Sequence, residues 1–281
     1  MNKAHSNSFS YPLVSVVLPT RGDVGKSVLI KICSQTYKNY EIIIVSDNPE
    51  LKLPEGSFLK IKKLKVIYNK NKVGISYARN IGIKEAKGEI IAFIDDDAIP
   101  EVDWLEKLVE CFTYTNADCI FGKVIPKDLN LPKIILVLTE LYDTMVGCNM
   151  AFRKEALIKV GLFNEKIDYG GDENELIVRM FKQGYKISIC PNAIVRHNFA
   201  KNYMDLFKKI YKGGKNAYLL KNNNAIKKIK RTKLIKELFL KREFLTIFLF
   251  SLLFIIRRIG IVIGKIQHFN NSIKSLRWKI S

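Results

Sequence analysis

The stretch Ile90–Pro100, IIAFIDDDAIP, joins a short apolar run to three consecutive aspartates, Asp95, Asp96 and Asp97. An apolar run of this length is consistent with a buried β-strand. Three like charges at the end of a buried strand repel one another and lose solvation, so a cation is needed beside them. A divalent metal ion is the obvious candidate, because hard cations prefer carboxylate oxygens and often bind together with phosphates. The stretch therefore predicts a strand that ends at a site for metal-assisted chemistry on a nucleotide-linked substrate.

Strand and helix patterns alternate around this stretch. Apolar runs predict strands at Val14–Leu18, Glu41–Val45, Lys65–Tyr68 and Glu89–Ile94, and helical spacing predicts helices at 24–35, 75–86 and 103–112. This alternation predicts an α/β fold with a mainly parallel sheet and helices on both faces. Ligands of such sheets bind beyond the carboxyl ends of the strands. Thr20, Asp47 and Asp95–Asp97 all follow predicted strands, so we expect them to share one site.

The second half is less regular, and the charge changes sharply near residue 200. The pattern predicts strands at 118–125, 148–152 and 186–189, helices at 154–160 and 172–182, and a short apolar helix or loop at 131–142. Residues 1–200 hold 27 Lys and Arg against 24 Asp and Glu, a balance of +3, whereas residues 201–281 hold 20 against 3, a balance of +17. We therefore expect a catalytic domain at 9–200 and a basic helical region at 201–281.

A second acidic cluster opens the helix predicted at 172–182. Asp172 and Glu173 follow two glycines, and Glu173 shares a helix face with Leu176 and Ile177. A carboxylate in this position can face the site and act as a general base. For both acids the alternative is N-terminal capping and compensation of the helix dipole, which explains Asp172 equally well.

Four further side chains are candidates for ligand contacts. Arg21 and Arg79 suit a diphosphate through bidentate hydrogen bonds, although each alone is as well explained by a surface ion pair. Asp47 either hydrogen-bonds a base or ribose or caps a turn. His197 follows a β-like run and can complete a metal shell with the aspartates, although a lone histidine is more often structural.

One stretch points elsewhere. Thr20–Ser27, TRGDVGKS, has the Gly-Lys-Ser of a phosphate-binding P-loop but carries threonine in place of its first glycine. A P-loop-like NTPase and a non-catalytic membrane or nucleic-acid adaptor remain the alternative functions. The basic excess lacks interleaved aromatic residues or a known motif, so nucleic acid is not an expected partner.

Six stretches in this order resemble the family 2 glycosyltransferases of the GT-A fold. They are Val14–Arg21 (VSVVLPTR), Glu41–Asn48 (EIIIVSDN), Gly74–Gly82 (GISYARNIG), Gly88–Leu105 (GEIIAFIDDDAIPEVDWL), Gly147–Phe152 (GCNMAF) and Gly170–Leu176 (GGDENEL). The resemblance implies an inverting, metal-dependent hexosyl- or N-acetylhexosaminyltransferase that uses Mn²⁺ or Mg²⁺ and a nucleotide-sugar donor, for which we expect a UDP-sugar.

The resemblance also implies site residues. Thr20, Arg21, Asp47, Arg79, Asp95 and Asp96 match donor-binding positions, and Asp95, Asp97 and His197 match metal-binding ones. The family usually shows Glu-Asp where this chain has Asp172-Glu173, and the aspartate is its base. Glu173 therefore matches the catalytic base with a longer carboxylate, and the choice between Glu173 and Asp172 stays open.

The tail suggests a membrane surface. Phe244–Ile256 has 13 largely apolar residues, about 20 Å of helix against a hydrocarbon core of about 30 Å, and Arg257 and Arg258 follow. With the basic run before it, segment 227–263 predicts a peripheral or monotopic attachment to anionic lipid. The alternative is an apolar helix buried on the catalytic domain or in a dimer interface.

The expected location follows from the tail and the N-terminus. No apolar leader is visible, and the five cysteines show no CxxC pair. We expect the cytoplasmic side of the membrane and a lipid-linked glycan or polyprenyl phosphate as acceptor.

Overall fold

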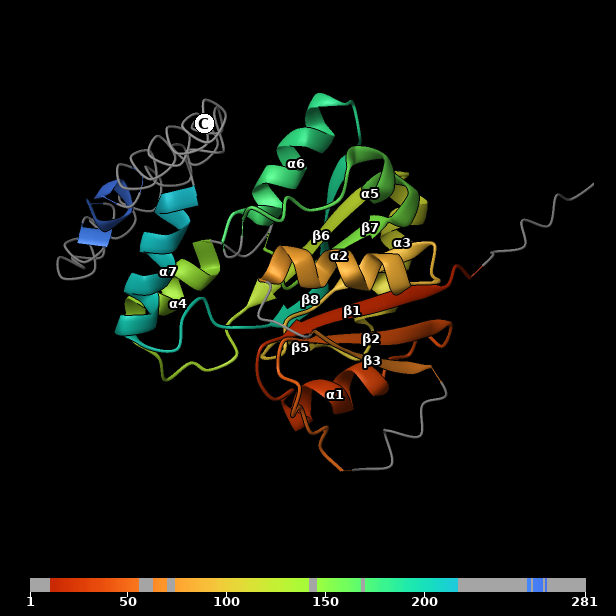
Figure 1. Cartoon of the computed structure of the whole chain (residues 1–281), viewed down its shortest axis with the longest axis horizontal. Helices are drawn as coiled ribbons and strands as arrows, with labels where there is room; N and C mark the ends of the chain where they lie inside the picture. Colours follow the sequence, from red (N-terminus) through yellow and green to blue (C-terminus); the bar gives the residue numbers. More distant parts are fainter. Residues whose placement is uncertain are drawn as a thin grey trace, which may run out of the picture.

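The computed structural model describes residues 11–55, 63–69, 74–141, 146–167, 170–216, 252–253, 255–259 and 261. Its centre is an eight-stranded sheet with the strand order β3-β2-β1-β4-β7-β6-β8-β5 (Figure 1). The strands are β1 (Val14–Thr20), β2 (Tyr40–Ser46), β3 (Leu64–Tyr68), β4 (Ile90–Phe93), β5 (Ile99–Pro100), β6 (Cys119–Ile125), β7 (Met150–Arg153) and β8 (Ile187–Arg196). The helices are α1 (Lys26–Cys33), α2 (Ile75–Glu85), α3 (Trp104–Thr115), α4 (Lys133–Leu141), α5 (Lys154–Val160), α6 (Asp172–Lys182) and α7 (Tyr203–Asn216).

The sheet is parallel in its first half and mixed in its second. β3, β2, β1 and β4 pair in parallel, and so do β6 and β8. β7 runs antiparallel to both β4 and β6, and β5 runs antiparallel to β8. A parallel return needs a crossover over one face of the sheet. Because α4 packs in a separate cluster with α7, the chain re-enters the sheet at the end where β6 left it. The predicted mainly parallel sheet is therefore a mixed sheet.

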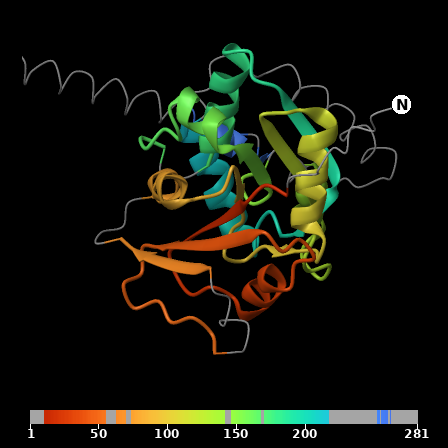
Figure 2. The same ribbon diagram turned by 90° about the vertical axis from the view of Figure 1, so that its right-hand side faces the viewer.

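Helices cover both faces of the sheet, as predicted. One apolar core joins the strands to α1 and α3, with Val28, Leu29, Trp104 and Leu108 among its members. The other joins them to α2, α5 and α6. Figure 2 shows α2 and α1 on opposite sides of the first strands. Successive side chains of a strand point to opposite faces of the sheet. Val16 therefore lies in the first core and Val17 in the second.

Two details of the strands differ from the sequence prediction. The strand predicted at 186–189 continues to Arg196, although Pro191 lies within it. The register shifts between Gly122 and Lys123 of β6, so residues 191–193 bulge out of the ladder and the proline costs no regular pairing. The two-residue strand β5 was missed because two residues have no readable period.

A third, smaller apolar cluster lies beside the sheet. It contains Ile134, Ile135 and Leu138 of α4, Leu206 of α7, Ala200 and Leu253. α4 and α7 lie next to each other away from the central strands (Figure 1). Of the predicted apolar segment 244–263, residues 252–253, 255–259 and 261 are described, and all are helical. Among the described residues, no helix combines the length and apolar character needed to cross a membrane. The basic run 227–242 lies outside the described residues.

Candidate active site

Three strand ends meet at one edge of the sheet. Thr20 is the last residue of β1, Asp47 follows β2, and Asp95–Asp97 follow β4; β1 pairs with both other strands. The Asp47 N–H donates to the Thr20 carbonyl at 2.9 Å. Thr20 Oγ1 donates to Asp96 Oδ2 at 2.5 Å. Burial raises the pKa of Asp96, an effect that the Thr20 hydrogen bond opposes and the charges of Asp97 and Asp95 reinforce.

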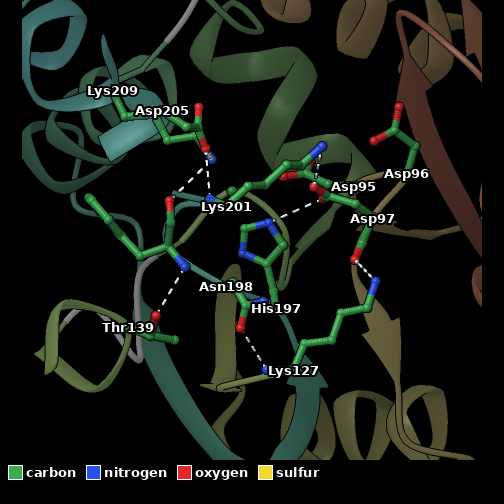
Figure 3. Close-up of polar contacts among 12 residues, drawn as sticks. Asp95, Asp96, Asp97, Lys127, Thr139, His197, Asn198, Lys201, Asp205 and Lys209 are labelled. Atoms are coloured by element: carbon green, nitrogen blue, oxygen red, sulfur yellow. Dashed lines mark hydrogen bonds and ion pairs between the residues drawn. The ribbon is translucent and has the colours of Figure 1, made fainter. Parts of the chain in front are cut away.

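Asp95, Asp97 and His197 form a group that can hold a metal ion. One ligand atom from each lies within 4.8 Å of the others. His197 directly follows β8, and its N–H donates to Ile125 O at 2.9 Å, so the pairing of β8 with β6 carries the imidazole to the aspartates. His197 Nε2 lies 3.2 Å from Asp97 Oδ1 (Figure 3). These are the three residues that the sequence proposed as metal ligands.

The chemistry of this group fits a divalent cation. Asp95 Oδ1 is buried and accepts no hydrogen bond from the described residues. Its neighbouring charge is Arg79 Nη2 at 3.5 Å, so the oxygen can still coordinate a cation. A site of two carboxylates and one imidazole suits Mn²⁺ or Mg²⁺ better than a site of thiolate ligands would.

The protonation states of Asp97 and His197 in this group depend on the contact between the two side chains. Burial disfavours the charged form of both side chains. The hydrogen bond and charge of His197 nevertheless lower the pKa of Asp97. The pKa of His197 is raised, against burial, by the neighbouring Cys148 and Asp97. Metal binding therefore requires His197 to release a proton, because a metal-bound imidazole is neutral.

Arg79 connects this group to the second acidic cluster. Its side chain is 2% exposed and forms an ion pair with Asp172 through Nη1. Nη2 donates to Gly147 O at 3.2 Å and lies 3.5 Å from Asp95 Oδ1. The guanidinium also lies over the ring of Phe163, at 5.4 Å from its centroid. The structure thus places Arg79 between the carboxylates of Asp95 and Asp172.

The two acids at the start of α6 have different surroundings. The helix begins after Gly171, whose φ of 97° is a left-handed conformation that favours glycine. Asp172 is 2% exposed and paired with Arg79. Glu173 is partly buried and accepts a hydrogen bond from Asn174 Nδ2 at 2.9 Å. Burial, the Asp172 charge and a hydrogen bond with Asp172 raise the pKa of Glu173 to about 8, against the opposing charge of Arg79.

Each carboxylate oxygen of Asp47 has a polar neighbour. Oδ1 accepts a hydrogen bond from Asn69 Nδ2 at 2.7 Å, and Oδ2 lies 3.9 Å from Nε of Arg21. Asp47 is buried, whereas the Arg21 side chain is 49% exposed. This end of the site therefore offers a fixed carboxylate and a solvent-facing guanidinium.

Sequence reasoning missed four residues of this region. Asn69 holds Asp47, Gly147 lies against Arg79, and Lys127 and Lys201 contact Asp97. Gly147 carried a signal, since it opens one of the quoted motifs. Nothing distinguishes the two lysines in a chain with 47 Lys and Arg.

Comparison with known proteins agrees with this geometry. The sequence profile of the family described as "Glycosyl transferase family 2" matches residues 15–161. A second profile, "N-terminal domain of galactosyltransferase", matches residues 138–202. A glucosyl-dolichyl phosphate glucuronosyltransferase of Haloferax volcanii is 28% identical over 259 residues, which cover 73% of this chain and 82% of that protein.

Solved structures share the fold. A mannosyltransferase from Pyrobaculum calidifontis, in complex with GDP-Man and Mn²⁺, superposes with a TM-score of 0.58 at 19% identity, covering 76% of this chain and 66% of the other. A fragment of S. aureus TarS in complex with UDP superposes with a TM-score of 0.52 at 16% identity, covering 79% and 70%. At such identities the likeness establishes the GT-A fold alone. With its family profile matching more than half of its length, the chain belongs to the family 2 glycosyltransferases.

Proposed function

We propose that this protein is an inverting, metal-dependent glycosyltransferase. It moves a sugar from a nucleotide-sugar donor, for which we expect a UDP-sugar, to an acceptor hydroxyl on a lipid-linked glycan or to a polyprenyl phosphate at the membrane. The observation that carries the proposal is the position of Arg79, which pairs with Asp95 of the metal-binding group and with Asp172, the neighbour of Glu173.

Neither alternative function has comparable support. In a P-loop the Gly25 amide would face a phosphate, but here it donates to Asp96 O at 3.4 Å. A non-catalytic adaptor gives no reason to hold three carboxylates, a histidine and a buried arginine together. Family membership favours transferase chemistry over both.

The donor lies at the strand ends in this proposal. Thr20, Arg21 and Asp47 hold the nucleoside, together with Asp96, whose carboxylate accepts the Thr20 hydroxyl hydrogen bond. Asp95 and Asp97 lie on the diphosphate side, where they need a cation between themselves and the phosphates. Bound by Asp95, Asp97 and His197, Mn²⁺ or Mg²⁺ would neutralise the leaving nucleoside diphosphate. Arg79 keeps the carboxylates of Asp95 and Asp172 in place.

Glu173 is the base. As the acceptor oxygen forms its bond to the anomeric carbon, Glu173 takes the hydroxyl proton and the bond from that carbon to the diphosphate oxygen breaks on the opposite face. The sugar inverts in one step, and no covalent enzyme intermediate forms. A base is most useful when its pKa lies near the working pH, and a pKa of about 8 for Glu173 meets that condition.

A membrane-bound acceptor is supported by the cluster of α4, α7 and Leu253. Its surroundings expose the apolar side chains Leu129, Tyr203, Met204, Ile255 and Ile259. The same segments of the chain carry the basic residues Lys201, Lys208, Lys212, Arg257 and Arg258. Apolar and basic side chains together suit an anionic lipid surface. The Haloferax relative is named for a dolichyl phosphate-linked substrate. We accordingly propose peripheral or monotopic attachment on the cytoplasmic side, through 227–263 and this cluster.

A panel of nucleotide sugars tests the proposal. The purified full-length protein is incubated with UDP-, GDP- and other nucleotide sugars, with and without Mn²⁺, and nucleotide release is measured. We expect Mn²⁺-dependent release from one donor class and none from Asp97→Asn. Release of inorganic phosphate from nucleoside triphosphates, with no effect of nucleotide sugars, would refute the proposal. Co-sedimentation with vesicles containing anionic lipid tests the attachment, and an unbound full-length protein would contradict it.

A further inference from the structure

An exposed lysine faces one of the candidate metal ligands. Lys201 Nζ lies 3.8 Å from Asp97 Oδ2, while His197 Nε2 lies 3.2 Å from Oδ1 (Figure 3). Each carboxylate oxygen of Asp97 therefore has a nitrogen beside it. The Lys201 side chain is 74% exposed, so this ion pair is weak and easily broken.

The main chain at Lys201 is fixed although its side chain is not. The Lys201 N–H donates to Asp205 Oδ2 at 3.0 Å, and the Asp205 N–H donates to Asn202 Oδ1 at 2.9 Å. These hydrogen bonds hold the chain at the entry to α7. The flexible four-carbon stem of the lysine can move the ammonium while the backbone stays in place.

Asp97 itself is held from another side. Lys127 Nζ donates to the main-chain carbonyl of Asp97 at 3.0 Å, and Asn198 Oδ1 accepts the Lys127 N–H at 2.9 Å. The loop after β6 is thus tied to both Asp97 and the residue after His197. A change of partner at the Asp97 carboxylate would leave its backbone where it is.

A divalent cation and the Lys201 ammonium compete for the same carboxylate. A bound Mg²⁺ would lie about 2.0–2.1 Å from its oxygen ligands, closer than the ammonium at 3.8 Å, and a divalent cation carries twice the charge. The two cations repel each other, so loading the metal displaces Lys201. The diphosphate of the donor is the anion that arrives with the metal.

We propose that Lys201 binds the donor's diphosphate after a divalent metal displaces it from Asp97. In the metal-free protein the Lys201 ammonium pairs with the Asp97 carboxylate. In the protein with metal and donor bound it pairs with a phosphate oxygen of the donor. The inference rests on the proposed function, because it needs both a divalent cation and a nucleoside diphosphate. It predicts that one side chain has opposite effects on two affinities: Lys201 weakens metal binding and strengthens nucleotide binding.

Two binding measurements on full-length Lys201→Met test this. Mn²⁺ affinity without nucleotide is measured by the electron paramagnetic resonance of free Mn²⁺, and UDP and GDP affinities are measured by calorimetry at saturating Mn²⁺. We expect Mn²⁺ to bind about 2- to 5-fold more tightly, the worth of an exposed ion pair. The nucleotide that binds the wild type should bind about tenfold more weakly, the worth of a charge-assisted hydrogen bond.

Two controls separate charge from fold. Lys201→Arg keeps the charge and should change both affinities less than Lys201→Met does. Lys208→Met removes an exposed charge from α7, the helix that begins two residues after Lys201, and should change neither. Unchanged affinities in Lys201→Met, or a change of both in the same direction, would overturn the inference while leaving the proposed function intact. A wild type that binds neither Mn²⁺ nor nucleotide would overturn both.

Discussion

Arg79 and Asp172 form a buried ion pair across 93 positions of the chain. Arg79 comes from α2, Asp172 opens α6, and both side chains are almost fully buried. Because Arg79 also lies 3.5 Å from Asp95, the pair joins the end of β4 to the start of α6. The Arg79 pKa is raised by Asp172, Asp95 and Glu173 in spite of burial, so the guanidinium stays charged.

The first prediction concerns the stability of this pair. Arg79→Met leaves Asp172 buried without its partner, and such losses cost about 3–5 kcal/mol of the free energy of unfolding. Asp172→Asn leaves Arg79 with Asp95, 3.5 Å away, as its remaining acidic partner and should cost less. The double variant should lose less than the sum of the two, and urea unfolding measures all three. Additive losses would mean that the two side chains do not interact.

The second prediction separates the two acids of α6. Glu173→Gln should lower kcat by about 10²- to 10⁴-fold, the usual contribution of a general base, with donor affinity nearly unchanged. Because the raised pKa means that the fold disfavours the ionised Glu173 carboxylate, the neutral amide should raise the free energy of unfolding at neutral pH and not lower it. Asp172→Asn should instead show its main effect on stability. Equal turnover by Glu173→Gln and the wild type would remove Glu173 from the role of base.

The third prediction is a pH dependence. The pKa of Glu173 is raised to about 8, so below that pH the carboxyl holds its proton and cannot accept another. The value of kcat/KM should rise about tenfold per pH unit below the pKa and level off above it. A bound cation nearby favours the carboxylate and should move the midpoint downward. Carbon-13 NMR of the metal-free protein, with Glu173→Gln to assign the signal, gives the midpoint directly; a value near 4.5 would contradict the prediction.

The fourth prediction uses two glycines as a matched pair. A Cβ on Gly147 would lie 2.6 Å from Arg79 Nη2, whereas a Cβ on Gly22 would meet nothing within 4 Å. Gly147→Ala should displace the guanidinium and lower the free energy of unfolding by about 1–3 kcal/mol, together with activity. Gly22→Ala should change stability by less than about 0.5 kcal/mol. Thermal unfolding and turnover of both variants provide the comparison.

The fifth prediction concerns the metal. Asp97→Asn and His197→Ala should each weaken Mn²⁺ binding at least tenfold, since even indirect partners of a metal site are worth about 10- to 100-fold. Because His197 has to lose a proton, Mn²⁺ affinity of the wild type should rise with pH. Calorimetry at several pH values measures both effects, and an affinity independent of pH would exclude His197 as a ligand.

The sequence was most informative where a side chain's position follows from one strand. Asp95–Asp97 and Thr20 lie at the ends of short apolar runs, so parallel pairing alone brings them together. His197 was harder, because the strand that carries it contains Pro191 and a bulge. The role of Arg79 was not readable from spacing, since its two partners lie on elements far apart in the chain. Whether a cation faces a phosphate or buried carboxylates depends on tertiary packing, and the motif around Arg79 is the same in either case.

The mixed half of the sheet was unpredictable for a related reason. Strand direction depends on where the connecting helix packs, and α4 carries apolar residues that fit either a sheet face or another helix. Its neighbours Leu206 and Leu253 lie in the region that sequence composition set apart from the catalytic domain. The composition shows a change in charge near residue 200. The small apolar cluster nevertheless contains residues from both sides of that position.

That small apolar cluster has a mechanical consequence. Leu253 lies against α4, and α7 begins two residues after Lys201. Moving Leu253 out of this cluster would expose apolar side chains of α4 to water. A membrane attachment made there would therefore be rigid. It would hold the strand ends that form the candidate active site at a fixed distance and orientation relative to the membrane surface.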